Sequence, residues 1–238
     1  MRPALALAFG LVLAAPAGAG AAEVRVMVVG EERVLREPAS VTLRARSVRA
    51  SNRRCAAGAA TPLSALAGTG LRLRLRDYGS CGRSARDAGG LFVTQVGAER
   101  NRGHDGWVYK IGHRTGTAGA ADPAGSFGTG RRLRDGESVL WFWCVQDRRQ
   151  NCQRTLEAVP ERTRVAPGAA LRVTVRSYDD FGGGLAAAGA TVRLGTAEAV
   201  AGADGAATLT APTAPGRASL VASGAGAVRA SPLRVTVG

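Results

Sequence analysis

Short stretches in which apolar and polar residues alternate recur along the chain, and glycine, proline and aspartate residues separate them. Alternation with a period of two is typical of half-buried β-strands. The sequence contains 33 glycines and only 5% aromatic residues, which favours thin, β-rich domains with many turns over long amphipathic helices. A collagen, a coiled coil, a multi-span membrane protein and a large enzyme are all disfavoured.

Residues 1–21 have the pattern of a secretion signal. Arg2 supplies a positive charge, residues 4–15 form an apolar run, and residues 19–21 give a small-x-small cleavage pattern. The apolar run is shorter than the roughly 20 residues needed to cross a bilayer. We therefore expect a mature protein that starts near Ala22, has no membrane span, and is secreted or associated with the cell envelope.

Export determines how the four cysteines are interpreted, because disulfides persist in oxidising compartments. Cys55, Cys81, Cys144 and Cys152 allow three pairings. Loop-closure entropy favours the local pairs Cys55–Cys81 and Cys144–Cys152. The alternative is a zinc site, but it lacks a CxxC pair and a suitably spaced histidine. We expect structural disulfides, no metal and no cofactor.

The chain divides near Pro160 into a predicted first domain, residues 22–157, and a second, residues 161–238. In the first domain we predict strands at 24–29, 41–46, 71–76, 91–96, 107–111 and 138–145. Thr61 and Pro62 are typical of a helix N-cap and first helical position, and Gly68 or Gly70 would end that helix. Two strands, one helix and several further strands form an α+β pattern compatible with a β-grasp.

The second domain is predicted to be all-β. Strands are expected at 171–178, 190–194, 206–210, 218–222 and 233–237, with glycine-containing turns between them. About 75 residues of short alternating strands predict a small immunoglobulin-like sandwich. We interpret it as a spacer or presentation module.

Two short motifs carry a family resemblance. The run Gly106-Trp107-Val108-Tyr109-Lys110, and later Leu133 to Phe142 with its Asp135-Gly136 turn, resemble the transcobalamin-like C-terminal domain family. The resemblance covers residues 24–157 and implies a β-grasp that binds a soluble ligand, a corrinoid in the known vertebrate case. Gly112-His113-Arg114 replaces the family's usual Asn-Gly turn, so cobalamin is not carried over. Residues 189–192 and 203–208 resemble bacterial immunoglobulin-like repeats of surface proteins.

Four aromatic residues form the first candidate site. Side chains two residues apart on a strand share a face, so Trp107 and Tyr109 lie together, as do Trp141 and Trp143. They either fill a core or form a platform on which a ring stacks. Lys110 and His113 flank a glycine-rich loop, residues 112–132, which ends in Arg131 and Arg132; an anionic ligand is one hypothesis there and a plain surface loop the other. The candidate ligand-binding residues are Trp107, Tyr109, Lys110, His113, Trp141 and Trp143.

The formal net charge is +14, and Lys110 is the only lysine. Arg72, Arg74 and Arg76 alternate with leucines and are expected on the exposed face of a strand. They either contact an anionic envelope polymer or form a solvated face in an arginine-rich protein. Export removes nucleic acid as a partner.

No nucleophile–base or acid–base set emerges, so we do not expect an enzyme. The run Ser80-Cys81-Gly82-Arg83 has the residues of a transpeptidase cysteine box in the wrong order. Asp179 and Asp180 suit a turn better than a calcium loop.

The sequence therefore predicts a secreted, monomeric, non-catalytic protein. Its first domain would bind an extracellular small molecule through the aromatic face and the glycine-rich loop. The alternative is a structural or adhesive envelope protein that binds a protein or an anionic polymer surface.

Overall fold

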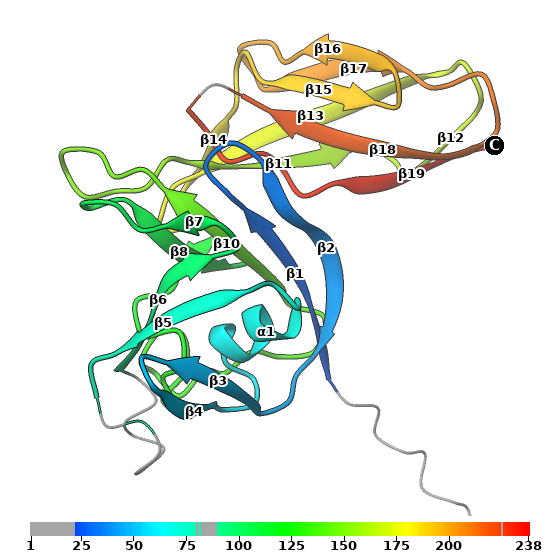
Figure 1. The fold of residues 1–238 in the computed structure, drawn as a ribbon. Coiled ribbons are helices and arrows are strands. Elements are labelled where there is room, and N and C mark those ends of the chain that lie inside the picture. Colours follow the sequence, from blue (N-terminus) through cyan, green and yellow to red (C-terminus); the bar gives the residue numbers. More distant parts are fainter. Residues whose placement is uncertain (1–21, 80, 82–89, 225) are drawn as a thin grey trace, which may run out of the picture.

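The computed structural model describes residues 22–79, 81, 90–224 and 226–238 (Figure 1). The predicted signal peptide, and Ser80, Gly82 and Arg83 of the run considered above, lie outside these residues. The described chain is mostly β, with four sheets and one short helix. Two sheets and the helix form a first unit up to residue 154, and the other two sheets form a second unit from residue 155 (Figure 1).

The central sheet of the first unit has the order β2-β1-β10-β8-β9. β1 and β10 pair in parallel, whereas the other neighbours are antiparallel. Its strands are β1 (Glu23–Val29), β2 (Val34–Thr42), β8 (Gly106–Ile111), β9 (Arg114–Thr115) and β10 (Ser138–Cys144).

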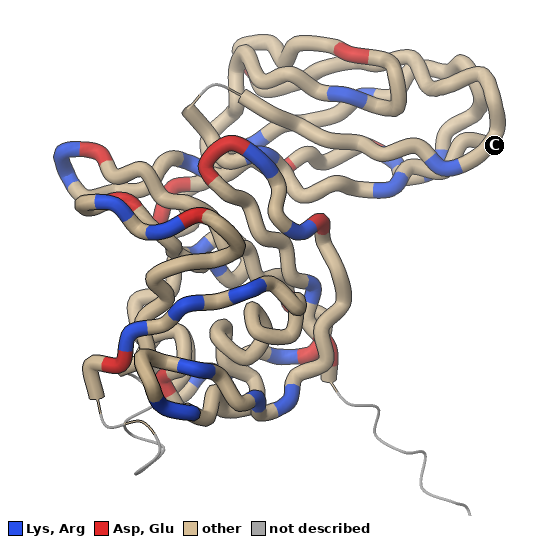
Figure 2. The backbone as a smooth tube through the Cα atoms, in the orientation of Figure 1, with Lys and Arg blue, Asp and Glu red and all other residues tan. Residues whose placement is uncertain are grey.

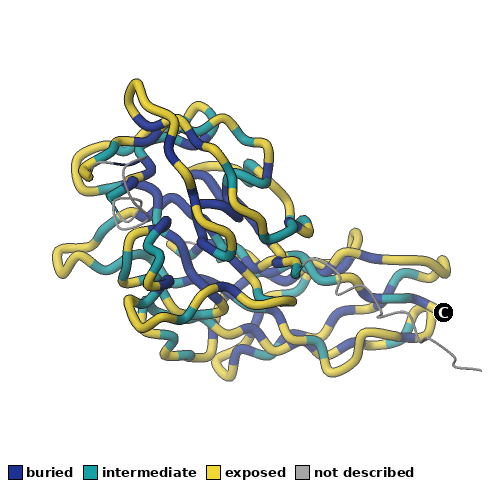
Figure 3. The backbone as a smooth tube through the Cα atoms, turned by 90° about the horizontal axis from the view of Figure 1, so that it is seen from below, coloured by how far each residue is buried: buried dark blue, intermediate teal, exposed yellow. Residues whose placement is uncertain are grey.

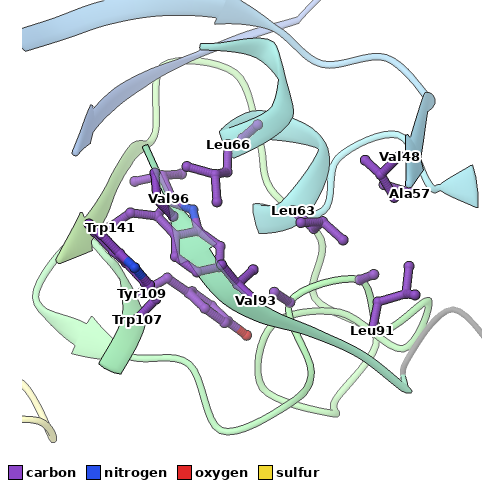
Figure 4. Close-up of a cluster of buried hydrophobic side chains, with 14 of the residues drawn as sticks. Val48, Ala57, Leu63, Leu66, Leu91, Val93, Val96, Trp107, Tyr109 and Trp141 are labelled. Atoms are coloured by element: carbon purple, nitrogen blue, oxygen red, sulfur yellow. The ribbon is translucent and has the colours of Figure 1, made fainter. Parts of the chain in front are cut away.

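The helix α1 (Pro62–Gly68) confirms the predicted start and end. The backbone N–H of Ser64 donates to the Thr61 hydroxyl, and the Thr61 backbone N–H donates to the Ser64 hydroxyl, so the two residues form a capping box. Leu63 and Leu66 are buried and lie against the central sheet, next to Trp141 and Val96 (Figure 4). The apolar side of the helix thus fills the space between the two sheets of this unit.

The second sheet of the first unit has the order β4-β3-β5-β6-β7. Buried and exposed residues alternate along β3, β4 and β5, as expected for a sheet with one wet face. Its strands are β3 (Arg46–Ala50), β4 (Arg53–Ala57), β5 (Leu73–Asp77), β6 (Leu91–Val96) and β7 (Glu99–Arg100).

The second unit is a sandwich of two sheets around one apolar core, which includes Leu171 and Val173 from one sheet and Val192 and Leu220 from the other. In one sheet β13 pairs with β11, β14 and β17; the other has the order β12-β19-β18-β15-β16. The strands are β11 (Thr155–Pro160), β12 (Arg164–Val165), β13 (Ala170–Tyr178), β14 (Gly184–Ala186), β15 (Thr191–Leu194), β16 (Ala197–Val200), β17 (Ala206–Thr210), β18 (Gly216–Ser223) and β19 (Leu233–Val237). The all-β sandwich expected here is present.

One predicted strand and one predicted domain boundary differ from the structure. We expected a strand at 41–46, but β2 ends at Thr42 and begins earlier, at Val34. Pro38 lies inside β2, and the strand tolerates it because β2 is at the edge of its sheet and needs fewer backbone donors. β11 pairs with β13, so strand pairing places residues 155–160 with the second unit, whereas we predicted that the first domain reaches residue 157.

The predicted local disulfides are present as Cys55–Cys81 and Cys144–Cys152. The first joins β4 to the segment after β5, and the second joins the end of β10 to the segment that leads into the second unit. Disulfides of this kind fit an oxidising extracellular or envelope compartment.

The central sheet is buried on both faces, and buried residues line the inside of both units (Figure 3). One face packs against α1 and the second sheet. The other face presents Met27, Val29, Phe142 and Cys144, which pack with Val228 of the second unit. β10 is apolar on both faces because another layer of the protein covers each of them.

Candidate functional site

The four aromatic side chains, which the sequence allowed either as core or as an open platform, do not form an open platform. Trp107, Tyr109, Trp141 and Trp143 are only 5%, 5%, 1% and 2% exposed and belong to the main core. Figure 4 shows Trp107, Tyr109 and Trp141 packed beside β6 and α1. The core interpretation is therefore the one that the burial supports: in a unit with few large side chains, these rings supply the volume that joins the two sheets.

The ring pairs also use their polar edges inside the fold. The Trp107 indole N–H donates to the Glu99 carbonyl at 3.1 Å, and the Trp141 indole N–H donates to the Pro62 carbonyl at 3.3 Å. The Tyr109 hydroxyl donates to the Ala118 carbonyl at 2.7 Å. Burial, and secondly the charge of Asp122, raise the pKa of Tyr109 to about 12.

The glycine-rich loop is packed onto the core. A Cβ at Gly116 would lie 2.1 Å from the Tyr109 ring, so glycine is needed for the close approach. The backbone N–H groups of Thr117 and Ala118 both donate to the Ser126 carbonyl. These two N–H groups therefore hydrogen-bond within the loop and are not free for an anion. Gly116 allows the loop to pack against the Tyr109 ring.

Lys110 lies at the junction of the two units and has no exposed side-chain surface. Its Nζ atom donates to the Thr155 hydroxyl at 3.2 Å, to the Tyr178 carbonyl at 3.2 Å and to the Asp179 carbonyl at 2.9 Å, and lies 3.9 Å from a carboxylate oxygen of Asp180. Burial is the main reason why the pKa of this ammonium is lowered to about 8. Lys110 therefore crosslinks the units and does not face solvent as a ligand-binding residue.

The rest of the junction surrounds that ammonium. The His113 ring stacks on the Tyr178 ring with centroids 3.6 Å apart, and the Tyr178 hydroxyl donates to Glu157 at 2.9 Å. Asp180 accepts from the Thr115 hydroxyl at 2.8 Å and from the Cys152 backbone N–H at 2.9 Å. The aspartates considered for calcium thus hold the turn and the lysine in place.

Exposed arginines gather on the wet face of the second sheet of the first unit. Arg72, Arg74 and Arg76 are exposed, as the alternation predicted. Figure 2 shows basic residues along β3, β4 and β5 on the lower part of the molecule. A shallow groove of about 560 Å³ lies here, and its charged lining residues are Arg49, Arg72, Arg74 and Arg100.

Strand pairing aligns four arginines across this sheet. Arg54 of β4 is directly opposite Arg49 of β3. Ala50 is paired with Leu75 in the parallel β3–β5 ladder, which places the preceding residues, Arg49 and Arg74, side by side. Gln95 of β6 pairs with Arg74 on one side and with Arg100 of β7 on the other. We call Arg54, Arg49, Arg74 and Arg100 the arginine row.

The arginine row lacks internal neutralisation. In the part of the chain that the structure describes, no carboxylate oxygen lies within 4.0 Å of a nitrogen of these four side chains. Like charges directly opposite each other on neighbouring strands are destabilising. Strand pairing thus places like charges on neighbouring strands, and an anion bound across the row would relieve their repulsion.

Two aromatic residues adjoin the arginine row. Tyr78 and Phe92 are 64% and 46% exposed, their rings are 6.1 Å apart, and the Arg76 guanidinium lies 4.7 Å from the centroid of the Tyr78 ring. The sequence indicated Arg72, Arg74 and Arg76 only. Arg49, Arg54 and Arg100 were missed because pairing between distant segments, and not local alternation, brings them alongside Arg74.

Comparisons with known proteins give distant structural similarity alone. No protein-family model and no curated protein matches the chain, so the transcobalamin-like resemblance stays a prediction from motifs. Among solved structures, the D00-D0 domain of intimin is 18% identical with a TM-score of 0.27, over 73% of this chain and 81% of that one. The D0-D1 domain of intimin has the same identity and TM-score, over 62% and 69%. Nothing about a ligand or partner follows from similarities of this size.

No helix among the described residues is long and apolar enough to span a membrane.

Proposed function

We propose that this chain is a non-catalytic protein of the cell envelope that binds an anionic polymer through the arginine row. The observation that carries the proposal is the alignment of four exposed arginines across a five-stranded sheet, with no carboxylate of the described residues within 4.0 Å of them. The alternative derived from the sequence is a structural or adhesive envelope protein that binds a protein or an anionic polymer surface. It takes precedence over binding of a soluble ligand by the aromatic rings, because those rings are buried.

The geometry of the row favours a polymer over a single small anion. Neighbouring strands are about 4.8 Å apart, so the row extends over roughly 19 Å from β4 to β7. Guanidinium groups pair in a bidentate manner with carboxylate and phosphate oxygens. A chain with repeated anionic groups that lies across the strands would contact several arginines at once, and each contact would add to the affinity.

We also propose a fold type for each domain and a location for the protein. The order β2-β1-β10-β8-β9, with a hairpin, a helix and a parallel β1–β10 pair, supports a β-grasp-like first domain. The two-sheet sandwich supports an immunoglobulin-like second domain that holds the first away from its attachment. We propose that the protein acts as a monomer, without a metal or cofactor, at the cell surface or envelope.

Binding to two synthetic polyanions, poly-L-glutamate and long-chain polyphosphate, tests the proposal. The double variant Arg49→Gln/Arg74→Gln removes the centre of the row. Exposed ion pairs contribute up to about 1 kcal/mol each, so we expect roughly a tenfold to thirtyfold loss of affinity. The matched control, Arg164→Gln/Arg193→Gln, removes two exposed charges from the second unit.

The salt dependence of polyanion affinity distinguishes contacts made by the arginine row from attraction by the net charge of the protein. Raising the ionic strength from 50 to 300 mM should weaken the wild-type protein, and the row variant should show a shallower dependence than the control. Equal losses in the row variant and the control would mean that net charge, and not the row, holds the polymer. In that case the proposal is wrong.

A further inference from the structure

The contact region between the units contains a second hollow, which shares no lining residue with the arginine row. One part, of about 310 Å³, is lined by apolar residues of both units, among them Met27 and Leu140 of the first and Leu156 and Leu233 of the second. An adjoining part, of about 400 Å³, shares Arg25, Pro38, Arg229 and Pro232 with it. The two parts thus adjoin each other, and together we call them the junction cleft.

The two ends of the junction cleft differ in chemistry. The second part is lined by four arginines, with Glu37 as its only acidic residue in the described chain. The first part has a mainly apolar wall and carries Glu157 and His113. Arg217 and Arg234 line only the second part, Glu157 lines only the first, and Arg25 and Arg229 line both where the parts meet.

Arg229 lies at the boundary of the two parts and is held in place from one side. One of its terminal nitrogens is 3.6 Å from a carboxylate oxygen of Glu37. Its Nε atom is buried and has no hydrogen-bond partner among the described residues. Because the Nε atom is buried, an oxyanion in the cleft would contact the part of the Arg229 side chain that stays accessible; the side chain is 30% exposed.

From this arrangement we propose that the junction cleft binds an anionic amphiphile, with its phosphate or carboxylate head at Arg229 and its apolar chain over Leu140 and Leu233. Charge sets the orientation, because Glu157 would repel the head from the apolar end. The apolar part has room for about ten groups of roughly 30 Å³, the volume that one water molecule occupies. A chain of about eight carbons therefore fits better than a long lipid tail.

The occupant would touch both units at once. Arg25 and Leu140 come from β1 and β10 of the central sheet, and Leu233 and Arg234 come from β19 of the sandwich. Binding would therefore stabilise the contact between the units, because only the assembled junction presents both the head and the chain sites.

The test uses the full mature chain and octyl phosphate below its micelle concentration, followed by isothermal titration calorimetry. The head-site variant is Arg229→Gln, and the chain-site variant is Ser231→Trp, which fills the cleft from an exposed position. The control is Arg193→Gln, an exposed arginine of the same unit. We expect a tenfold or greater loss of affinity in both cleft variants and less than a twofold change in the control.

Binding measurements with three other ligands identify which chemical features of the amphiphile the cleft recognises. Inorganic phosphate and octanol, each lacking one half of the amphiphile, should bind at least tenfold more weakly than octyl phosphate. Vesicles of phosphatidylglycerol distinguish a membrane headgroup from a free amphiphile: binding to vesicles at equal anion concentration, unaffected by Ser231→Trp, would assign the arginines to a lipid surface and overturn the cleft. Unchanged octyl phosphate affinity in Arg229→Gln would also overturn it.

This inference is independent of the polymer proposal. The row variant Arg49→Gln/Arg74→Gln should lose polyanion affinity and keep octyl phosphate affinity. The cleft variants should show the opposite pattern. If one experiment fails, the other proposal is unaffected.

Discussion

We expect the stability of the wild-type protein to rise with pH, and replacing Lys110 with methionine should abolish that rise. The folded ammonium has a pKa of about 8, against 10.5 for an ordinary lysine, because it is buried. Between these values the unfolded chain binds more protons than the folded chain, so the free energy of unfolding increases as the pH rises. Lys110→Met removes the titrating group and with it this increase.

The magnitude follows from the two pKa values. Linkage gives a gain of about 2 kcal/mol in the free energy of unfolding between pH 7 and pH 9.5. Above pH 10 the sign reverses, because the pKa of Tyr109 is raised to about 12 and its ionisation is easier in the unfolded chain. The informative window therefore ends near pH 9.5.

Guanidinium chloride unfolding followed by tryptophan emission measures the effect at pH 7, 8.5 and 9.5. Buried charges are screened little by the added salt. Arg132→Met, which removes an exposed positive charge, is the control and should keep the wild-type rise. A Lys110→Met profile that rises in parallel with the wild type would refute the argument, as would a flat wild-type profile.

Four shorter predictions concern the core, the disulfide, the helix cap and the buried amine. Trp141→Ala should lower the free energy of unfolding by about 3–5 kcal/mol, measured by denaturant titration, since it leaves a cavity between the two sheets; a cost below 1 kcal/mol would contradict its burial. Replacing Cys144 and Cys152 together by serine should cost about 2 kcal/mol, and a transition at the wild-type midpoint would count against it. Thr61→Ala should cost about 1 kcal/mol through loss of the N-cap, whereas Thr61→Ser should cost far less. An amine-reactive ester should modify Lys110 only after unfolding, as peptide mass mapping would show; labelling of the native protein would mean that the junction opens.

Local patterns in the sequence were sufficient for much of the secondary structure. Thr61 and Pro62 defined the start of α1, because capping depends on residues three apart. Alternation identified β5 and β17, since side-chain period does not depend on the partner strand. The cysteine pairs followed from loop length alone.

The function of individual side chains depended on contacts between distant segments. The sequence offered both Trp141 and Lys110 as candidate ligand-binding residues. In the structure, each is buried by a layer that covers its face of the central sheet. The three groups that accept hydrogen bonds from the Lys110 ammonium are 45 to 69 residues away, a separation at which local spacing carries no information.

The candidate sites likewise depend partly on local sequence patterns and partly on contacts between distant segments. The exposed arginines of β5 were determined by sequence alternation, whereas the arginine row exists because pairing of β3, β4, β5, β6 and β7 sets residues from 49 to 100 in one register. The sequence by itself determined many of the strands, the helix, the disulfides and the net charge of +14, but it did not give β3 and β4, which carry Arg49 and Arg54. Only the tertiary structure decided which aromatic rings are core, which charge is buried and where the free arginines meet, because burial and alignment are properties of packed elements and not of single segments.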